Sequence, residues 1–380
     1  MPEYKLKTLS PIHIGNGEQI NNWAYSIDNN KISIYKFEKV VNSIKNNKQR
    51  LINLTAEIER NPLTKNIGDI IKAWKLNIES EYTIEIKGKI KNHRNEYKQI
   101  WDFIKEGNEV YIPGTEIKGA IRTALFYKIL KDKFNQDKKL KENFLKDYEN
   151  CLRGENKKEI KKNFERLSKK WENYVFRGDF KENDGKKDFL RFLIVSDTDL
   201  KNPEECLEVD DIKLIGASGS FEELHEVLKA GTEFKIKMNI PWKEEYEGFI
   251  SDNYKYLGLK KLREACNEFA ESILETEIEY FKNTSDLNQR DKEIILVKLE
   301  RRLDLVKVAT NKKWLVLRLG KHQGFHSITI NLLVKQLNQM LFAKAFKEIA
   351  PKGYENKPNK SRKITLTNEI LGWLIIDLNS

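Results

Sequence analysis

The chain has 380 residues, of which 39% are hydrophobic and 33% are charged, and its formal net charge is +11. This length allows two domains and a substantial core, and the positive charge favours an anionic partner, with nucleic acid as the first expectation. We expect no membrane partner, because no apolar run reaches the length of a membrane span, no signal peptide opens the chain and no terminal amphipathic helix carries a clustered basic face. The three cysteines, Cys151, Cys206 and Cys266, are scattered and odd in number. This pattern is typical of the reducing cytoplasm and excludes a cysteine-rich zinc module.

The first part of the chain shows short strand and helix patterns. Residues 4–9 alternate polar and apolar side chains, which predicts a half-buried strand. In the loop that follows, Gly15 and Gly17 flank Asn16, so the backbone can adopt positive φ and approach a ligand closely; an ordinary loop is the alternative. His13, in the same loop, is by itself more typical of a structural histidine than of a catalyst. Later patterns predict a hairpin at 23–35, helices at 37–44 and 67–74, a strand at 82–88 and a basic loop at 89–98.

Residues 111–125 form the most distinctive stretch. An apolar pair runs into Pro113 and Gly114, which is a turn signal. Thr115 follows at the expected N-cap of a helix, with Glu116 in the positive first turn. Apolar residues then recur at helical spacing. The stretch therefore predicts a turn that leads into an amphipathic helix.

Two basic residues and a glycine stand out in this predicted helix. Lys118 and Arg122 lie four residues apart and share a face, with Gly119 between them in the sequence. A glycine inside a helix costs about 1 kcal/mol against alanine, which indicates close approach by another backbone or by a ligand. Free amides at a helix N-terminus, the positive dipole end and two cations one turn apart form a phosphate-binding layout. The alternative is a capped amphipathic helix with two solvated basic residues, and the spacing does not match a P-loop.

The middle of the chain combines a charged insertion with further strands. Residues 136–173 are rich in Lys and Glu but keep an apolar seam, which predicts a helical insertion with a solvated face rather than a dedicated RNA surface. A looser loop closes the insertion near residue 187. Strands are predicted at 189–195, 208–216 and 233–240, with a short helix at 221–228. With the first strand and the helix after Pro113, this order is the strand–helix–strand–strand–helix–strand plan of a ferredoxin-like (RRM-like) domain with insertions.

After residue 241 the pattern becomes mainly helical. It predicts helices at 254–281, 290–309 and 328–349, a strand at 314–317, a polar basic loop at 351–363 and closing strands at 364–367 and 372–376. We therefore predict an α+β protein with two domains. Residues 1–241 form the ferredoxin-like N-terminal domain, with its charged helical insertion at about 136–187. Residues 242–380 form a mainly helical α+β C-terminal domain with a glycine-containing loop.

That loop, at residues 318–327, is the second candidate site. Gly320 and Gly324 would admit an RNA backbone, and Arg318 and Lys321 could contact its phosphates. The sequence therefore places a second set of possible phosphate contacts far from the first.

The histidines and two acidic residues offer weaker signals. His322 and His326 are four apart, as in some helical metal sites, but the glycine between them argues against a helix and no nearby carboxylate completes a ligand set. We expect neither a metal nor another cofactor. His13, His322 or His326 could serve as a general base on a ribose 2′-hydroxyl. Asp197 and Asp199 could hold magnesium, although a polar strand exit explains them more simply.

Four segments resemble the RAMP superfamily of CRISPR proteins, with the closest match to the fifth subunit of the type III-A (Csm) interference complex. Residues 112–125, with the sequence IPGTEIKGAIRTAL, resemble the signature helix of the superfamily. Residues 9–17 are similar to its opening segment, and residues 371–375 to its terminal strand. Residues 317–325 resemble its glycine-rich loop, although His322 stands in place of one glycine. The middle insertions match nothing that we can place.

The resemblance implies an RRM-like subunit of an RNA-guided antiviral complex in the cytoplasm. Such a subunit caps the 3′ portion of the guide RNA (crRNA), contacts the backbone RAMP subunit and other subunits, and contributes to guide maturation by recruiting or positioning a host nuclease, without being a nuclease itself. The alternative is a metal-independent RAMP endoribonuclease that uses a histidine general base on CRISPR repeat RNA. The predicted RNA-binding residues are His13, Gly15, Gly17, Gly114, Thr115, Glu116, Lys118, Gly119, Arg122, Arg318, Gly320, Lys321, His322, Gly324 and His326.

Overall fold

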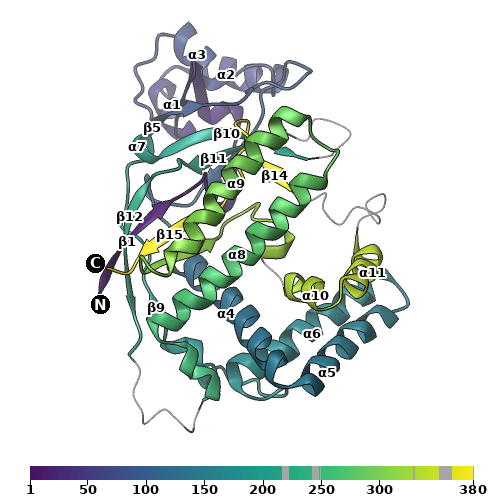
Figure 1. Ribbon diagram of the computed structural model, residues 1–380. Helices are drawn as coiled ribbons and strands as arrows, with labels where there is room; N and C mark the ends of the chain where they lie inside the picture. Colours follow the sequence, from purple (N-terminus) through teal and green to yellow (C-terminus); the bar gives the residue numbers. More distant parts are fainter. Residues whose placement is uncertain (216–221, 242–247, 249, 328–329, 351–361, 380) are drawn as a thin grey trace.

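Two β-sheets organise the chain (Figure 1). The computed structural model describes residues 1–215, 222–241, 248, 250–327, 330–350 and 362–379. The first sheet is antiparallel throughout, in the order β13-β15-β1-β12-β9. Its strands are β1 (Glu3–Thr8), β9 (Ile194–Val195), β12 (Glu233–Asn239), β13 (Trp314–Arg318) and β15 (Trp373–Asp377).

The second sheet is mixed and has the order β2-β6-β11-β10-β5-β4-β3, with β14 beside β10. The pairs β10–β5 and β11–β6 are parallel, and the others are antiparallel. Its strands are β2 (Gly15–Ile20), β3 (Tyr25–Asp28), β4 (Lys31–Ile34), β5 (Tyr82–Ile86), β6 (Ile100–Phe103), β10 (Leu207–Leu214), β11 (Glu222–Leu228) and β14 (Lys363–Ile364). A small hairpin pairs β7 (Lys105–Glu106) with β8 (Glu109–Val110).

The helices fall into three groups (Figure 1). Near the second sheet, α1 (Phe37–Ile44), α2 (Lys48–Arg60) and α3 (Ile67–Ala73) enclose a small core of their own, and the one-turn α7 (Pro203–Cys206) precedes β10. Three long helices pack on one another and against β13: α4 (Gly114–Gln136), α8 (Leu259–Asn283) and α9 (Gln289–Ala309). The remaining helices, α5 (Lys138–Asn150), α6 (Lys157–Arg177), α10 (Asn331–Leu337) and α11 (Gln339–Ile349), pack together beside α4.

The predicted ferredoxin-like plan is present, but some elements differ from those expected. It runs β1-α4-β9-β12-α8-β15, and the sheet order β15-β1-β12-β9 is that of the plan with its last strand beside its first. The second helix of the plan is therefore α8, and the closing strand is β15. The division of the chain at residue 241 stays a prediction, and the first sheet joins strands from both sides of it.

The predicted helix at 221–228 is wrong, because residues 222–228 form strand β11. The sequence EELHEVL consists mostly of helix-compatible residues. In the fold, however, β11 pairs with β10 and β6, and its residues from Leu224 to Leu228 are all buried. Tertiary pairing thus overrides local propensity here. The predicted strand at 189–195 is also mostly wrong: Phe189–Phe192 is a 3-10 turn, and only β9 is extended.

The other predicted elements are close to the observed ones. The charged insertion is helical, and its apolar seam buries Phe144 and Trp171 against the main core. The helix predicted at 254–281 begins later, at Leu259, and the one predicted at 328–349 is divided into α10 and α11. Most of the basic loop predicted at 351–363 lies outside the described residues. All three cysteines are buried and unpaired, and no described helix is long and apolar enough to span a membrane.

Candidate nucleic-acid interface

Helix α4 begins two residues earlier than predicted, and its first amide is already occupied. Pro113, not Thr115, is the N-cap residue. The amide of Gly114 donates to Asp197 Oδ1 at 2.7 Å. A Cβ atom at Gly114 would lie 2.5 Å from the carbonyl oxygen of Val195, so only glycine fits where the helix starts against this segment. Because the protein's own carboxylate sits at the positive helix end, the predicted anion site there is partly filled from within.

Arg122 is tied into the protein rather than directed freely toward a ligand. Its guanidinium lies 2.9 Å from Asp188 and 3.6 Å from Glu172. It also lies 3.7 Å from the ring centroid of Phe176, a fully buried residue of α6. These contacts make Arg122 a link between α4 and the charged insertion, and its side chain keeps 30% exposure. Its predicted contact with a phosphate stays a prediction.

Lys118 and Gly119, by contrast, remain open to a ligand. Among the described residues, Lys118 has no ion-pair or hydrogen-bond partner, although partial burial lowers the pKa of its ammonium and the charge of Asp188 opposes that shift. Gly119 is exposed, and nothing lies within 4 Å of where its Cβ would be. No described neighbour in the chain therefore requires a glycine at this position. Thr115 is exposed one turn earlier, and Glu116 is partly buried, so the first turns of α4 present a small accessible face.

The opening segment and the glycine-containing loop meet in space, although they are about 300 residues apart in the sequence. The amide of Lys321 donates to the carbonyl of His13 at 2.8 Å. Gly320 has φ +83°, and a Cβ there would lie 2.6 Å from the same carbonyl oxygen. Both the backbone conformation and the lack of space therefore require glycine. The ammonium of Lys321 lies 3.5 Å from the ring centroid of Trp101 on β6. Lys321 itself is exposed, which leaves a lysine beside an indole near the surface.

The three glycines left from the predicted set differ in their surroundings. Gly17, with φ +92°, has nothing within 4 Å of a Cβ position. Gly324, with φ +83°, has Arg318 Nη1 as its nearest neighbour at 3.9 Å. Gly15 has no room for a side chain, because a Cβ there would lie 2.9 Å from His13 Nε2. The positive φ predicted for this opening loop is therefore observed at Gly17.

Two residues of the predicted set lie in the interior. Arg318 is buried, and its Nε donates to the carbonyl of Leu371 while one terminal nitrogen donates to Ser327 Oγ. His326 is buried against Phe342, and burial lowers its pKa to about 4. Neither side chain lies where a phosphate could reach it, so the expectation of RNA contacts from both is corrected. They hold the loop onto β15 and α11 instead.

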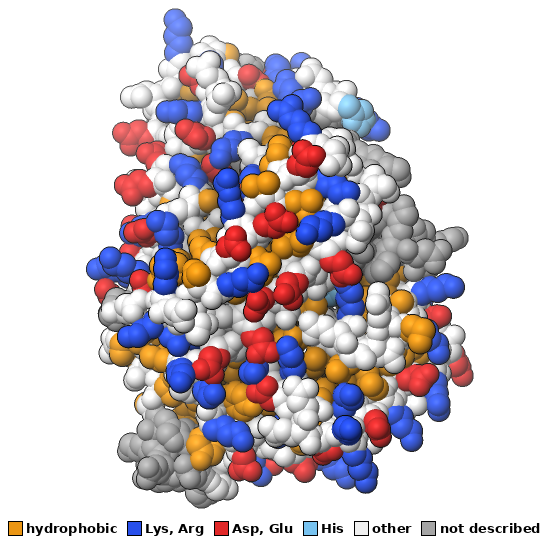
Figure 2. Space-filling view, viewed as in Figure 1, with side chains coloured by type: hydrophobic (Ala, Val, Ile, Leu, Met, Phe, Trp, Pro, Cys, Tyr) orange, Lys and Arg blue, Asp and Glu red, His pale blue; other side chains and the backbone are white. Residues whose placement is uncertain are grey.

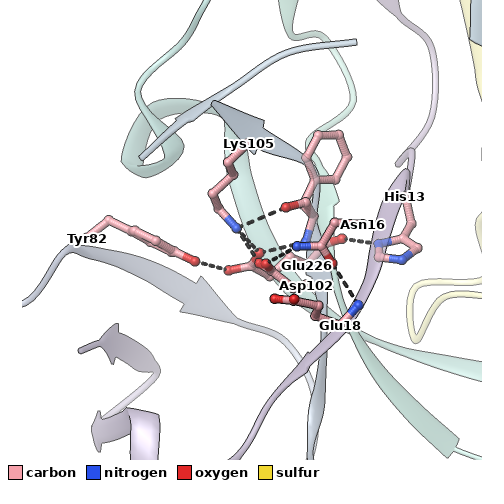
Figure 3. Close-up of polar contacts among 8 residues, drawn as sticks. His13, Asn16, Glu18, Tyr82, Asp102, Lys105 and Glu226 are labelled. Atoms are coloured by element: carbon pink, nitrogen blue, oxygen red, sulfur yellow. Dashed lines mark hydrogen bonds and ion pairs between the residues drawn. The ribbon is translucent and has the colours of Figure 1, made fainter. Parts of the chain in front are cut away.

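His13 is also enclosed, at the edge of a buried polar network on β11 (Figure 3). It has no exposed surface; its Nδ1 lies 2.7 Å from the carbonyl oxygen of Glu226, and burial lowers its pKa to about 3. The Glu226 carboxylate accepts from Tyr82 at 2.6 Å and from Lys105 at 2.6 Å. It also accepts from the amide of Phe103 at 3.0 Å. Burial raises the pKa of Glu226, and the charge of Lys105 opposes that shift.

His322 and His326 point to different places, so they do not form the pair considered from the sequence. The ring of His322 approaches His225 of β11, with 3.2 Å between the two Nε2 atoms. His225 also lies 3.5 Å from Glu223 Oε2. His225 was missed because its segment was predicted as a helix, in which residues 223 and 225 would not share a face. Alternation along a strand was the signal that could have revealed it.

The charges on the described surface are mixed where α8 and α9 lie. Figure 2 shows Lys and Arg side chains interspersed with Asp and Glu over this face, with no continuous basic area. Neither the signature residues of α4 nor the glycine-containing loop belongs to α8 or α9. The exposed members of the predicted set are Gly15, Gly17, Thr115, Gly119 and Lys321, whereas Lys118, Arg122 and His322 are half-buried.

Comparison with known proteins shows the family to which the chain belongs. The chain is 26% identical over 311 residues to the CRISPR system Cms protein Csm5 of Methanocaldococcus jannaschii, which covers 76% of this chain and 68% of that protein. A chain from the cryo-EM structure of a Csm-crRNA-target RNA ternary complex of a type III-A CRISPR-Cas system superposes with a TM-score of 0.74 at 22% identity, over 99% of this chain and 100% of that one. The crystal structure of T. onnurineus Csm5 gives 0.70 at 21% identity, over 98% and 99%. A family model of the RAMP superfamily matches residues 5–287, and the chain belongs to that superfamily.

Proposed function

We propose that this protein is a non-catalytic RNA-binding subunit of a type III-A CRISPR antiviral complex. It binds and caps the 3′ portion of the guide RNA and contributes to its maturation. Support comes from membership of the RAMP superfamily, from the Csm5 relatives over nearly the whole fold, and from the net charge of +11. Its partners are the guide RNA, the backbone RAMP subunit and other subunits of the complex, and a recruited nuclease.

The observation that carries this proposal is the open pair Lys118 and Gly119. A helix interior rarely keeps an exposed glycine without a packing reason, since alanine is better by about 1 kcal/mol. Here no described atom requires the glycine, and the adjacent lysine has no acidic partner among the described residues. A phosphate–sugar backbone passing over Gly119, with its phosphate on Lys118, accounts for both.

The histidine-based alternative is less well supported. A general base must come within about 3 Å of the hydroxyl it deprotonates, and its pKa works best near the operating pH. His13 and His326 are enclosed, and burial lowers the pKa of His322 to about 2. We therefore propose binding without catalysis. The check is incubation of the purified protein with labelled repeat RNA in EDTA. Specific cleavage that disappears in a His322→Ala variant would contradict the non-catalytic proposal and favour the endoribonuclease alternative.

The direct test of the binding proposal is charge reversal at Lys118. Lys118→Glu should weaken guide RNA binding at least tenfold, about 1.4 kcal/mol, because an attractive charge-assisted contact becomes a repulsion. Lys161→Glu on α6 is the matched control, since Lys161 is exposed and the change in net charge is identical. Lys157 is unsuitable as a control because its ammonium donates to the carbonyl of Ala350. Equal losses in filter binding would mean that only net charge matters.

Binding should also be electrostatic and weakly sequence-specific. A basic RAMP protein without an evident aromatic RNP motif should lose affinity steeply with salt, at roughly 0.7 log unit per phosphate contact per log unit of salt. The Lys118→Glu variant should therefore give a shallower salt slope than wild type. A flat wild-type titration, or strong preference for one single-stranded sequence, would contradict this expectation.

A further inference from the structure

His225 of β11 and His322 of the glycine-containing loop face each other in an arrangement whose role is independent of RNA binding. We propose that Glu223, His225 and His322 form a zinc site that fastens the loop after β13 to strand β11. One ligand atom from each of the three side chains lies within 4.8 Å of the others. Glu223 and His225 are two residues apart on one strand, so both project from the same face of the sheet. His322 arrives from a loop 97 residues further along the chain.

Two of the three spacings between the ligand atoms match a tetrahedral metal site. Ligand atoms about 2.0–2.1 Å from a zinc ion at tetrahedral angles are about 3.3 Å apart. The two Nε2 atoms of His225 and His322 are 3.2 Å apart, and His225 Nε2 is 3.5 Å from Glu223 Oε2. Two imidazoles and a carboxylate are an established zinc ligand set, which leaves a fourth position for solvent.

The histidines around this point are incompletely satisfied by the protein. His225 is fully buried, and its Nδ1 has no hydrogen-bond partner in the part of the chain that the structure describes. His13, whose ring centroid is 4.5 Å from that of His225, is also fully buried, and no described residue is a hydrogen-bond partner of its Nε2. Buried polar atoms normally find partners, so these two nitrogens show that the surroundings of the site are polar, although neither is a proposed zinc ligand atom. Three imidazoles packed together present several nitrogen donors and acceptors, unlike a cluster of hydrophobic side chains.

The backbone of His322 gives an independent reason to expect a ligand. Its φ is +70°, in the left-handed region that favours glycine, whereas a side chain with a Cβ is strained there. Strain of this kind persists where the surrounding structure needs the side chain. In the structure that side chain points inward, to the ring of His225 at a centroid distance of 4.7 Å and to the ring of His13 at 6.4 Å.

The neighbouring charges select the kind of metal. Lys363 lies 3.0 Å from Glu223 Oε2, and the charge of Lys321 is also close enough to lower the pKa of His225, after burial. Two lysines oppose a cation, so an ion held mainly by charge, such as Mg²⁺ or Ca²⁺, is disfavoured. Zinc forms strong bonds to neutral imidazole, and it can displace the lysine from the carboxylate.

The experiment measures metal content and needs no RNA, so its outcome is independent of the proposed function. The full-length protein is stripped with EDTA, dialysed against zinc chloride with excess Mg²⁺, and its bound zinc is measured by mass spectrometry. We expect about one zinc per chain. The key variant is His322→Gly, which removes a ligand while relieving the backbone strain, so the fold should be kept. The matched control is His93→Ala, an exposed histidine of the basic loop.

The proposal requires that His322→Gly lose zinc affinity at least tenfold and that His93→Ala behave like wild type. Glu223→Gln is a second variant and should also bind more weakly. Cobalt added to the wild-type protein should give the visible absorption of a four- or five-coordinate ion, which His322→Gly should lack. Substoichiometric zinc in the wild type, or equal zinc in wild type and a folded His322→Gly variant, would overturn the proposal.

Discussion

Replacing Gly119 by alanine should change stability and RNA affinity in opposite directions. Gly119 is the sixth residue of the 23-residue helix α4, so its substitution reports the full difference in helix propensity. Nothing lies within 4 Å of the added Cβ, so no steric cost offsets this gain. Alanine is favoured over glycine in a helix interior by about 0.8–1.0 kcal/mol. We therefore expect Gly119→Ala to raise the free energy of unfolding by close to 1 kcal/mol, measured by urea denaturation followed by circular dichroism.

The same methyl group should obstruct an RNA backbone that passes over Gly119. We expect affinity for guide RNA to fall about tenfold, or about 1.4 kcal/mol, in filter binding at fixed salt. Gly258→Ala provides the control, because a Cβ at that residue before α8 also meets open space but lies outside the predicted RNA-binding set. A more stable Gly119→Ala protein with unchanged RNA affinity would refute the reasoning that assigns this glycine to ligand approach.

Three further predictions concern the interior of the protein. Arg122→Gln should destabilise the fold by roughly 1–3 kcal/mol in urea denaturation, because it removes a charge-assisted bond to the largely buried Asp188. Lys105→Met should cost about 3 kcal/mol by leaving the buried Glu226 carboxylate without its cation, and a second change, Glu226→Gln, should recover part of that loss. His13 makes stability depend on pH: its pKa is lowered to about 3 in the fold, so below the unfolded value of about 6.5 the unfolded chain binds more protons. Stability should therefore fall with decreasing pH, by up to about 1.4 kcal/mol per pH unit, and His13→Asn should reduce this slope between about pH 6 and pH 4.

Each of these has an outcome that would count against it. An Arg122→Gln protein as stable as wild type would show that the link to the insertion contributes nothing measurable. A Lys105→Met, Glu226→Gln double variant no better than Lys105→Met would mean that the charge of Glu226 is not what makes the single change costly. If wild type and His13→Asn gave the same pH slope, proton uptake by His13 on unfolding would not be involved.

Local patterns in the sequence were enough to predict many of the helices and strands. The period of apolar residues after Pro113 predicted α4, the alternation in the first strand predicted β1, and the apolar run at 372–376 predicted β15. These succeed because helical and strand periods are properties of a few consecutive residues. The superfamily was also evident from short segments, since the residues of the signature helix are contiguous.

Other features were evident only in the tertiary structure, because they depend on contacts between residues that are distant in the sequence. Residues 222–228 have helix-compatible side chains but form strand β11, because β10 and β6 pair with it on either side. Arg122 pairs with Asp188, 66 residues away, while Lys118 has no ion pair among the described residues. His322 met His225 rather than His326 because the loop at 318–327 folds against β11. Contacts of this kind are fixed by packing and burial across the whole chain, which no local window of sequence contains.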